Sequence, residues 1–390
     1  MIDEKQVWEG FKRHFFLDPD RLYSAHGRME IIGNHTDHNH GLCILSGVDM
    51  GTVAAVRQTY DDRVRIVSKG YREASFDLLG DLSPNPAESH SSLSLAKGVM
   101  AKMRELGYKL GGFEAYLESD IFRGAGVSSS ACFESLIAKI VDDLYNGNAL
   151  DPLNMAKISQ YAENAYFGKP CGLLDQIGAC YGGLCYVDFL DPNEPTVEPL
   201  EWGFPLHPVL INSGGSHAGL TPHYASISQD MFDVAEKMFG KRYLRDVSPE
   251  EFFSAVSMPT EGVSEIAKLR ATHFYQENRR VEEARQAVKR KDVATFLRLI
   301  NESGYSSEKL LQNTMVPLHY PHSPQEAIDR LRPFLGQGAI RIMGGGFAGS
   351  VIAFLYPRDL PLFLKAARSY YGAELVKEAE MAVGGPRRVK

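Results

Sequence analysis

The sequence predicts a soluble protein of the α+β class, and three observations support this prediction. The chain has 390 residues, which is too long for one ordinary hydrophobic core and indicates two domains. Hydrophobic residues make up 44% of the chain and charged residues 23%, as in globular proteins that fold in water. Segments with strand and helix periodicity follow one another without the strict alternation of a doubly wound parallel sheet.

The first half combines strands with amphipathic helices. Alternating apolar residues predict strands over 51–56 and 63–68, with Asp61 and Asp62 in the turn between them. By the same criteria, helices are predicted at 93–106, 130–145 and 152–167, and strands at 113–118, 183–189 and 209–211. The segment 190–205 contains four prolines and is predicted to be a loop. This loop is the expected domain boundary, which divides the chain into residues 1–200 and 201–390.

The second half is richer in helix. Periodic apolar positions predict helices at 224–239, 261–289, 293–312 and 324–335. Two strands, at 339–343 and 351–355, flank a run of glycines. The chain contains no internal repeat and no low-complexity tract.

Bulk properties exclude several classes of function. The formal charge of −7 argues against a nucleic-acid-binding surface, although backbone amides can still bind a nucleotide phosphate. No apolar run is long enough to span a bilayer, and the first five residues lack the features of a signal peptide. Five cysteines without a Cys-x-x-Cys pair indicate reduced, mostly buried thiols. We expect a cytoplasmic protein, and the sequence does not indicate its oligomeric state.

The most informative segment is 27–39, which reads Gly-Arg-Met-Glu-Ile-Ile-Gly-Asn-His-Thr-Asp-His-Asn. An apolar pair leads into a turn that carries Asn34, His35 and Asp37, and such a turn suits a polyol that needs donors and acceptors at fixed positions. The segment closely resembles the sugar-binding signature of galactokinases, Gly-Arg-x-Asn-Leu-Ile-Gly-Glu-His-Thr-Asp-Tyr-Asn. It departs at one important position, where Asn34 replaces the usual Glu.

A zinc site is the competing interpretation of this turn. His35, Asp37, His38 and His40 are residue types that bind zinc. However, adjacent positions on a short loop cannot easily converge on one ion, and no distal cluster of ligands completes a site. The sequence therefore favours sugar binding.

The loop 124–131, Gly-Ala-Gly-Val-Ser-Ser-Ser-Ala, lies between a predicted strand and a predicted amphipathic helix. Glycines let the backbone approach an anion, and the helix start supplies amide donors and a positive dipole end. A plain glycine turn with a serine N-cap is the structural alternative. The loop resembles the phosphate loop of GHMP kinases, Pro-x-Gly-x-Gly-Leu-Ser-Ser-Ser-Ala, although Phe122 and Val127 replace its proline and leucine.

Three further segments resemble the same family. Glu163 precedes Cys-Gly-Leu-Leu-Asp-Gln at 171–176 with the spacing of the galactokinase pattern Ala-Glu-His…Pro-Cys-Gly-Ile-Met-Asp-Gln. The segment 341–350 resembles the third GHMP motif, Lys-Met-Thr-Gly-Gly-Gly-Phe-Gly-Gly, in which Arg341 and Met343 are modest departures. The segment 212–219 matches Asn-Ser-Asn-Val-Arg-His-Ser-Leu less well, because Ser216 stands at the arginine.

Taken together, the resemblance implies a two-domain GHMP kinase fold with the active site in the inter-domain cleft. It implies transfer of the γ-phosphoryl group of ATP to the anomeric hydroxyl of a galactose-type sugar, with Mg²⁺. The implied catalytic pair is Arg28 and Asp175, and Ser130 with Glu163 is implied to hold the metal. The resemblance further implies sugar contacts from Asn34, His35, Asp37, Gly172 and Tyr224, and ATP contacts from Gly124, Gly126, Ser128, Ser129 and Ser130.

Two alternatives remain open at this stage. The protein could act on a different sugar, such as galacturonate or an N-acetylated hexosamine, or it could be a sugar-sensing regulator without catalysis. Asn34 keeps a carbonyl acceptor but removes the charge, so we expect galactose to be the principal substrate, with more tolerance of galacturonate. On this reasoning the Asn34→Glu variant would be more selective for galactose.

Overall fold

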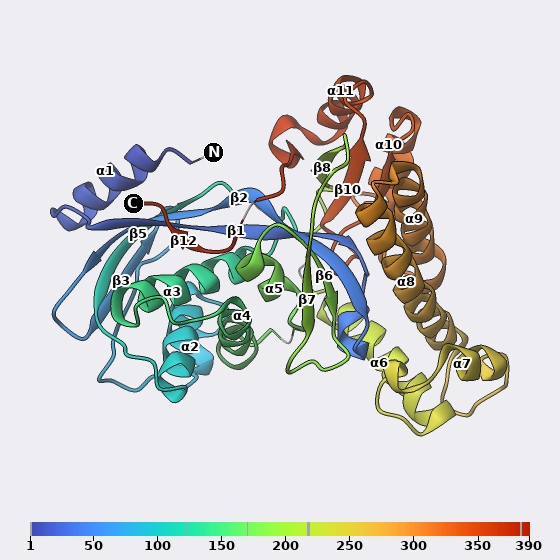
Figure 1. Cartoon of the computed structure of the whole chain (residues 1–390), viewed down its shortest axis with the longest axis horizontal. Coiled ribbons are helices and arrows are strands. Elements are labelled where there is room, and N and C mark those ends of the chain that lie inside the picture. The colour runs from blue at the N-terminus through green and yellow to red at the C-terminus, as the bar shows by residue number, and fades with distance from the viewer. Residues whose placement is uncertain (1, 123, 170, 217–218, 383) are drawn as a thin grey trace.

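The described elements form two β-sheets with helices packed against them (Figure 1). The computed structural model describes residues 2–122, 124–169, 171–216, 219–382 and 384–390. In these residues an eight-stranded sheet has the order β12-β1-β2-β5-β3-β4, with β6 paired to β2 and β7 to β6, and a four-stranded sheet has the order β11-β8-β10-β9. The strands of the larger sheet are β1 Arg21–Ile32, β2 Leu42–Gln58, β3 Arg63–Ser68, β4 Ala74–Asp77, β5 Phe113–Ser119, β6 Leu184–Asp188, β7 Thr196–Leu200 and β12 Arg387–Arg388. Those of the smaller sheet are β8 His207–Asn212, β9 Ala339–Ile342, β10 Ser350–Leu355 and β11 Val376–Glu378.

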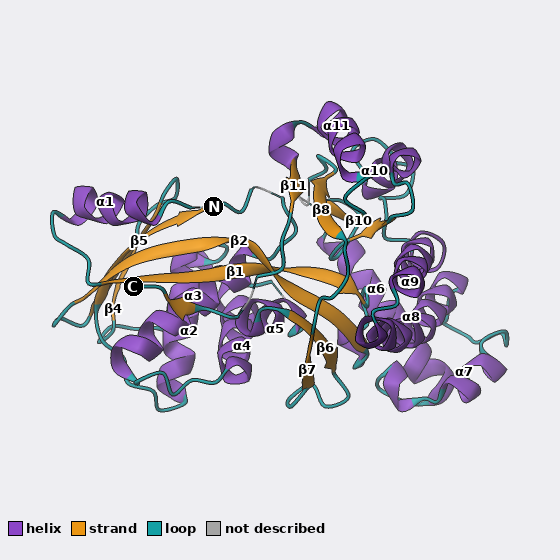
Figure 2. Cartoon of the chain, turned by 45° about the horizontal axis from the view of Figure 1, so that its top comes forward, coloured by secondary structure: helices purple, strands orange, loops and turns teal. Residues whose placement is uncertain are grey.

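Helices cover both faces of the larger sheet but unequally. The helices α2 to α5 pack on one face, and α1 packs on the other face against the start of β1 (Figure 2). The helices of this half are α1 Glu4–Phe15, α2 Ser92–Glu105, α3 Ser129–Tyr145, α4 Pro152–Tyr161 and α5 Leu174–Tyr181. Those of the second half are α6 Thr221–Phe239, α7 Pro249–Ala255, α8 Glu265–Arg290, α9 Val293–Ser306, α10 Pro324–Leu331 and α11 Leu360–Tyr371. Short turns of helix are η1 Asp37–Asn39, η2 Pro86–Glu88, η3 Ala162–Phe167, η4 Leu244–Asp246, η5 Ser307–Leu311, η6 Arg332–Phe334 and η7 Ala373–Leu375.

The long strands β1 and β2 contribute to two hydrophobic cores. Near its start, β1 places Tyr23 in the core beneath α2 to α5. Near its end, it places Met29 and Ile31 in a second core with residues of α8, α9, β9 and β10. The two halves therefore share buried apolar surface, whose removal from water stabilises their mutual position.

The last described strand, β12, pairs with the edge of β1. Tyr23 lies opposite Arg388 and Ser24 opposite Arg387 in an antiparallel ladder. The amide of Val389 donates to the carbonyl of Leu22 at 2.8 Å. Although the larger sheet otherwise ends at Leu200 and the smaller begins at His207, this late strand returns to the first half. The division at residue 200 stays a prediction.

Most predicted elements are confirmed within one to four residues at their ends. The prediction of a loop at 190–205 is wrong, because β7 lies within it and pairs with β6. Prolines are tolerated there because β7 is an edge strand and needs hydrogen bonds on one side only. The sequence did not predict the helices α1, α5, α7 and α11. The strand predicted at 51–56 is too short, since β2 begins at Leu42.

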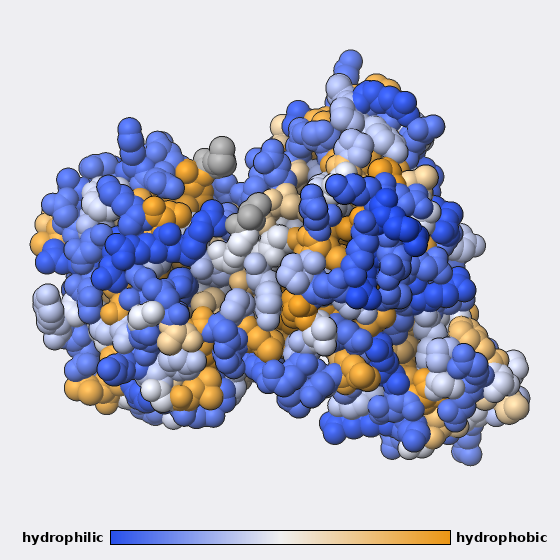
Figure 3. All heavy atoms as spheres, viewed as in Figure 1, coloured by the Kyte–Doolittle hydropathy of each residue, from blue (hydrophilic) through white to orange (hydrophobic). Residues whose placement is uncertain are grey.

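The outer surface is predominantly hydrophilic in the view of Figure 3, with small separated apolar patches. Within the described ranges, no helix combines the length and apolarity needed to cross a membrane. Four of the five cysteines are buried and Cys171 is partly buried, and all are free thiols, which confirms the prediction for these residues.

Candidate active site at the junction of the two sheets

Two β-bulges in β1 direct polar side chains into the site. The pairing of β1 with β2 shifts between His26 and Arg28 and again between Glu30 and Ile32. Bulges re-aim side chains and are frequent near active sites. Because residues two apart share a face of a strand, Arg28 and Glu30 point the same way while Met29 packs in the core.

Arg28 and Asp175 form a hydrogen-bonded ion pair between β1 and the first turn of α5. The Nε and Nη2 atoms of Arg28 lie 2.8 Å and 2.5 Å from Oδ1 of Asp175. The hydroxyl of Ser128 donates to the other carboxylate oxygen at 2.5 Å. Arg28 also donates to the carbonyl of Gly126 at 2.5 Å. The predicted catalytic pair and the predicted phosphate loop are therefore in direct contact.

The surroundings of Asp175 favour its ionised form. Burial alone would raise the pKa of this carboxyl. The charges of Arg28 and Lys169, with hydrogen bonds from Ser128 and Arg28, outweigh burial and hold the pKa below its usual value. The side chain of Asp175 is 20% exposed, so its carboxylate is accessible to a small molecule.

The predicted metal ligands Ser130 and Glu163 lie within hydrogen-bonding distance of each other. The hydroxyl of Ser130 donates to Oε1 of Glu163 at 2.9 Å. Glu163 is fully buried in η3, a turn of π-helix, and it also accepts from Lys169 at 2.8 Å and from Gln176 at 2.7 Å. Single π-turns inside helices are frequent at functional sites. A carboxylate beside a hydroxyl is the kind of oxygen donor set that fits Mg²⁺, which keeps several waters.

The side chain of Asp37 lies directly against Gly172 in the segment 171–176. A Cβ atom on Gly172 would lie 2.1 Å from Oδ2 of Asp37, so only glycine allows this approach. Burial, followed by the charges of Asp175 and Glu30, raises the pKa of Asp37 to about 6. Two predicted site carboxylates thus lie close enough to interact electrostatically, with pKa values shifted in opposite directions.

His35 and Tyr224 both hold the glycine loop between β9 and β10. Because a carbonyl only accepts, Nε2 of His35 donates to Gly345 at 2.8 Å. The hydroxyl of Tyr224 donates to the carbonyl of Gly346 at 3.1 Å, and a Cβ on Gly345 would lie 2.9 Å from the Tyr224 ring. These contacts bring the third glycine-rich motif to the predicted sugar-binding turn.

Asn34 is fully buried in a network of hydrogen bonds. Its Nδ2 donates to Oε1 of Glu30 at 3.0 Å and to the carbonyl of Gly344 at 2.7 Å. Its Oδ1 accepts from Nδ2 of Asn313 at 2.8 Å and from the hydroxyl of Ser307 at 3.4 Å. These partners occupy all four side-chain positions, so a sugar hydroxyl would have to displace one of them.

The backbone of the same turn is also held by the second half. The carbonyl of Asn34 accepts from Nε2 of His273 at 2.9 Å, and the amides of Gly33 and Asn34 lie 3.1 Å and 3.4 Å from Oε1 of Glu277. Burial lowers the pKa of His273 to about 4, which keeps this histidine neutral. The predicted sugar-binding turn is therefore held against α8.

The sequence analysis missed several polar residues of the site. Glu30 forms a buried ion pair with Arg341 at 2.9 Å and accepts from Asn34. A signal for Glu30 was present, because the galactokinase signature has Asn at this position. Glu134 lies four residues after Ser130 on α3, and burial and the Glu163 charge raise its pKa well above the usual value. Lys169, which contacts Glu163, gave no signal beyond its place at a helix end.

The phosphate loop adopts the expected turn before α3. Gly124 and Gly126 have positive φ angles of 74° and 70°, and Ser128 precedes the helix at Ser129. In the segment 212–219, His217 and Ala218 lie outside the described residues. Among the residues with described placement, no three His, Cys, Asp or Glu side chains form a group that could hold a metal ion.

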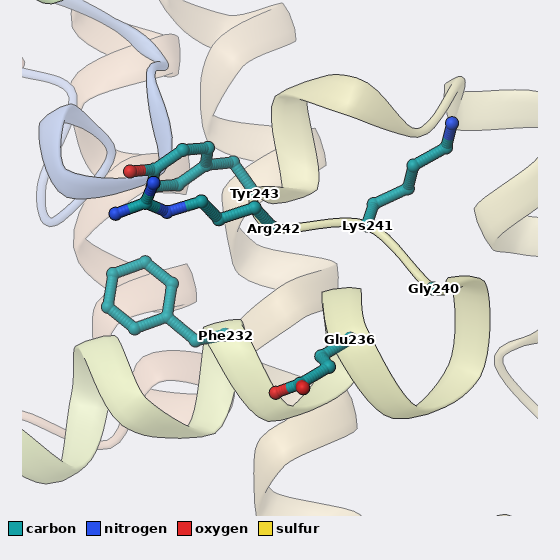
Figure 4. Close-up of a pocket in the computed structure, with 6 residues that line it drawn as sticks. All are labelled: Phe232, Glu236, Gly240, Lys241, Arg242 and Tyr243. Atoms are coloured by element: carbon teal, nitrogen blue, oxygen red, sulfur yellow. The ribbon is translucent and has the colours of Figure 1, made fainter.

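A separate surface hollow of about 620 Å³ lies at the end of α6 (Figure 4). It is lined by Phe232, Glu236, Gly240, Lys241, Arg242 and Tyr243. None of these is a predicted site residue. The ring of Tyr243 stacks on His40 with centroids 3.8 Å apart, so the hollow lies behind the predicted sugar-binding turn.

Family comparisons agree with this arrangement. The model described as GHMP kinases N terminal domain matches residues 94–183, which include the phosphate loop, Glu163 and Asp175. The model described as galactokinase galactose-binding signature matches residues 9–58, which include Arg28 and the turn after β1. The chain thus matches models of the GHMP kinase superfamily and of its galactokinase branch in two separate segments.

Curated galactokinases are similar to this chain over nearly its whole length. A galactokinase from Roseiflexus sp. (strain RS-1) is 28% identical over 382 residues, covering 96% of this chain and 93% of the relative. A galactokinase from Clostridium tetani (strain Massachusetts / E88) is 28% identical over 369 residues, covering 93% and 89%.

Solved structures share the fold of this chain. Lactococcus lactis galactokinase complexed with galactose superposes with a TM-score of 0.83 at 24% identity, covering 97% of this chain and 98% of that one. L. major mevalonate kinase in complex with R-mevalonate gives a TM-score of 0.63 at 14% identity, covering 94% and 99%. The predicted α+β GHMP kinase fold is confirmed.

Proposed function

We propose that this chain is an ATP-dependent sugar kinase that phosphorylates the anomeric hydroxyl of galactose to give galactose 1-phosphate. The observation that carries the proposal is the Arg28–Asp175 pair in contact with both Ser128 and Gly126 of the phosphate loop. This contact places an ionised carboxylate beside the loop that would hold the γ-phosphate. The curated relatives that cover most of the chain are galactokinases, which supports galactose as the acceptor.

In this proposal Asp175 accepts a hydrogen bond from the anomeric hydroxyl and takes its proton as the phosphoryl group is transferred. Arg28 keeps the carboxylate ionised and orients it through two N–H donors. Phosphoryl transfer depends mainly on positioning and charge neutralisation, so one well-placed carboxylate is sufficient acid–base chemistry.

Ser130 and Glu163 are proposed to hold Mg²⁺, and the loop from Gly124 to Ser130 to hold the phosphates of ATP. Bound Mg²⁺ would neutralise charge on the phosphate oxygens. Lys169 contacts Glu163 and its charge acts on Asp175, so it adds a positive charge to the same part of the site. Amides at the start of α3 supply further donors for an anion.

For the sugar, we propose contacts from His35, Asp37, Gly172 and Tyr224, with Asn34 beneath them. An ionised Asp37 can accept from two sugar hydroxyls. Gly172 contributes by leaving room for the Asp37 carboxylate. The division at residue 200, a cytoplasmic location and the absence of nucleic-acid and membrane partners are also retained as proposals.

The proposal is tested with purified protein, ATP, Mg²⁺ and a sugar panel of galactose, galacturonate and N-acetylgalactosamine. Galactose-dependent ADP formation, with a sugar phosphate that loses its reducing end, is the expected result. Preferential turnover of galacturonate would move the substrate assignment to the acidic sugar. Tight galactose binding without ADP formation would support the sugar-sensing alternative instead.

A further inference from the structure

We propose that Glu30 and Asn34 act as one exchanged pair that makes the sugar pocket insensitive to the C6 hydroxyl of the sugar. The inference rests on the proposed function, because it concerns how that sugar is selected. The galactokinase signature has Asn at the position of Glu30 and Glu at the position of Asn34. This chain has the two residue types in reversed order, and the structure brings their side chains together at 3.0 Å and 3.3 Å.

The contacts of Asn34 require an amide while Glu30 is ionised. Its Nδ2 faces two acceptors, the Glu30 carboxylate and the carbonyl of Gly344. Rotating the amide would place Oδ1 against both acceptors, and a glutamate here would place a second carboxylate beside the first. Like charges in a buried site repel strongly because the local dielectric is low.

Within the Glu30–Asn34 pair, Arg341 stabilises the negative charge on Glu30. Its guanidinium is fully buried, lies 2.9 Å from Oε1 of Glu30 and donates to the carbonyl of Ile31 at 2.9 Å. Removing either member of such a buried ion pair leaves an uncompensated charge. The Glu30 carboxylate is thus paired with Arg341. It does not take the place that the carboxylate of a glutamate at position 34 would have.

The pair nevertheless lies beside residues that are predicted to contact the sugar. Asn34 is followed by His35, which holds Gly345, and its own Nδ2 holds Gly344 of the same loop. The Glu30 charge adds to the raised pKa of Asp37. At position 34, the glutamate of the galactokinase signature is replaced by an asparagine. The four hydrogen-bonding positions of its amide already have protein partners.

In the galactokinases that this chain resembles, the Glu at the position of Asn34 accepts a hydrogen bond from the C6 hydroxyl of galactose, so the chemical consequence concerns the substituent at C6. A free carboxylate at position 34 would accept a hydrogen bond from a C6 hydroxyl and so strengthen its binding. The Asn34 amide oxygen already accepts two hydrogen bonds from the protein and offers no comparable acceptor. The protein as it exists should therefore use 6-deoxygalactose about as well as galactose, within about threefold in kcat/KM. A carboxylate–hydroxyl hydrogen bond corresponds to roughly tenfold or more in this ratio.

The test is a double-mutant cycle of wild type, Glu30→Asn, Asn34→Glu and the double variant Glu30→Asn/Asn34→Glu. Thermal unfolding midpoints and the galactose to 6-deoxygalactose ratio of kcat/KM are measured for each. The single Asn34→Glu change should lower the midpoint by about 5 °C or more. The double variant should recover the part of this loss that repulsion between the two carboxylates causes, but not the part caused by leaving Arg341 without Glu30. It should raise the sugar ratio about tenfold.

Glu114→Gln is a matched control, because Glu114 is a buried glutamate that pairs with Arg65 on β3. It should lower the midpoint but leave the sugar ratio unchanged. Independent effects of the two single changes on the midpoint would overturn the pair. An unchanged sugar ratio in the double variant would overturn its role in specificity. Should Asn34→Glu fail to fold, the double variant still decides between these outcomes.

Failure of the proposed function is recognised separately. If the wild type consumes no ATP with either sugar, the kinase proposal fails. Calorimetric binding of galactose and 6-deoxygalactose to wild type and the double variant then takes the place of kcat/KM. A tenfold change in their affinity ratio would support the exchanged pair, and equal ratios would overturn it.

Discussion

Asp175 and Asp37 interact electrostatically although they come from different parts of the fold, and their surroundings shift their pKa values in opposite directions. Asp175 lies in the first turn of α5 and contacts Arg28 and Ser128, and the Arg28 and Lys169 charges outweigh burial so that its pKa is lowered. Asp37 begins η1, and burial with the Asp175 and Glu30 charges raises its pKa to about 6. The fold thus gives two identical side chains different protonation behaviour.

This difference indicates a division of work. A carboxylate that stays ionised is suited to receive a proton, whereas one that is costly to ionise is stabilised by ligand donors. Binding of a polyol to Asp37 would supply hydroxyl donors that its own surroundings do not. The following four predictions break or sharpen this comparison, from the largest expected effect to the smallest.

Asp175→Asn should lower kcat by about 10² to 10⁴-fold, because it removes the proposed proton acceptor. The amide is nearly isosteric, so binding of galactose and ATP should remain, as measured by calorimetry. Retention of more than a tenth of the wild-type kcat would contradict the catalytic role of Asp175.

Asp37→Asn should raise the KM for galactose about tenfold and change kcat less, because a charged acceptor for the sugar becomes a neutral one. In the wild type, kcat/KM for galactose should fall below about pH 6 as Asp37 becomes protonated. The variant should lose this acid limb. A pH profile that keeps the limb would assign it to another group.

Glu163→Ala should raise the Mg²⁺ concentration needed for half-maximal activity about tenfold, with less effect on the KM for galactose. Gln176→Leu is a useful comparison, because it removes one hydrogen bond to Glu163 and leaves the carboxylate in place. If the variant changed only the affinity for the sugar, Glu163 would not be a ligand of Mg²⁺.

The same two aspartates should affect stability with opposite signs. The folded-state pKa of Asp37 lies above its usual value near 4, so its folded form binds the proton more tightly, and the unfolding free energy falls as pH rises from about 4 to 6. Asp37→Asn should therefore stabilise the sugar-free protein at pH 8 by about 1 kcal/mol, less than the shift alone implies because the group is partly exposed.

Asp175→Asn should destabilise the protein at pH 8, because it leaves Arg28 buried without its counter-charge. The contribution of Asp175 is present at neutral pH and lost as pH falls through its lowered pKa. Unfolding midpoints of both variants at pH 5 and pH 8 check these signs. Equal shifts in the same direction would contradict the comparison.

The sequence predicted the part of the site that depends on local motifs. Arg28, Ser128 and Asp175 were assigned from short segments, and the structure brings them together. The network around Asn34 could not be predicted, because Asn313 and Arg341 lie some three hundred residues further along the chain. Hydrophobic periodicity gives no information about which polar groups from different elements will meet.

The fold was predictable to a similar degree. Single amphipathic helices such as α3 were predicted correctly, since the spacing of their apolar residues is a local signal. The extent of β2 was underestimated because its first half is buried on both faces and lacks the polar–apolar alternation of a half-exposed strand. The strand β7 was missed because prolines usually exclude a strand, and its edge position is visible only in the sheet.

The pairing of β12 with β1 has a consequence for how the protein folds. The first sheet presents the edge of β1 as soon as residues 21–200 are made, but the strand that covers this edge follows the entire second half. During synthesis the edge is therefore open to pairing with other chains, and its closure requires contact between segments that are far apart in sequence. Closing the first sheet is thus a late event in the biogenesis of this protein.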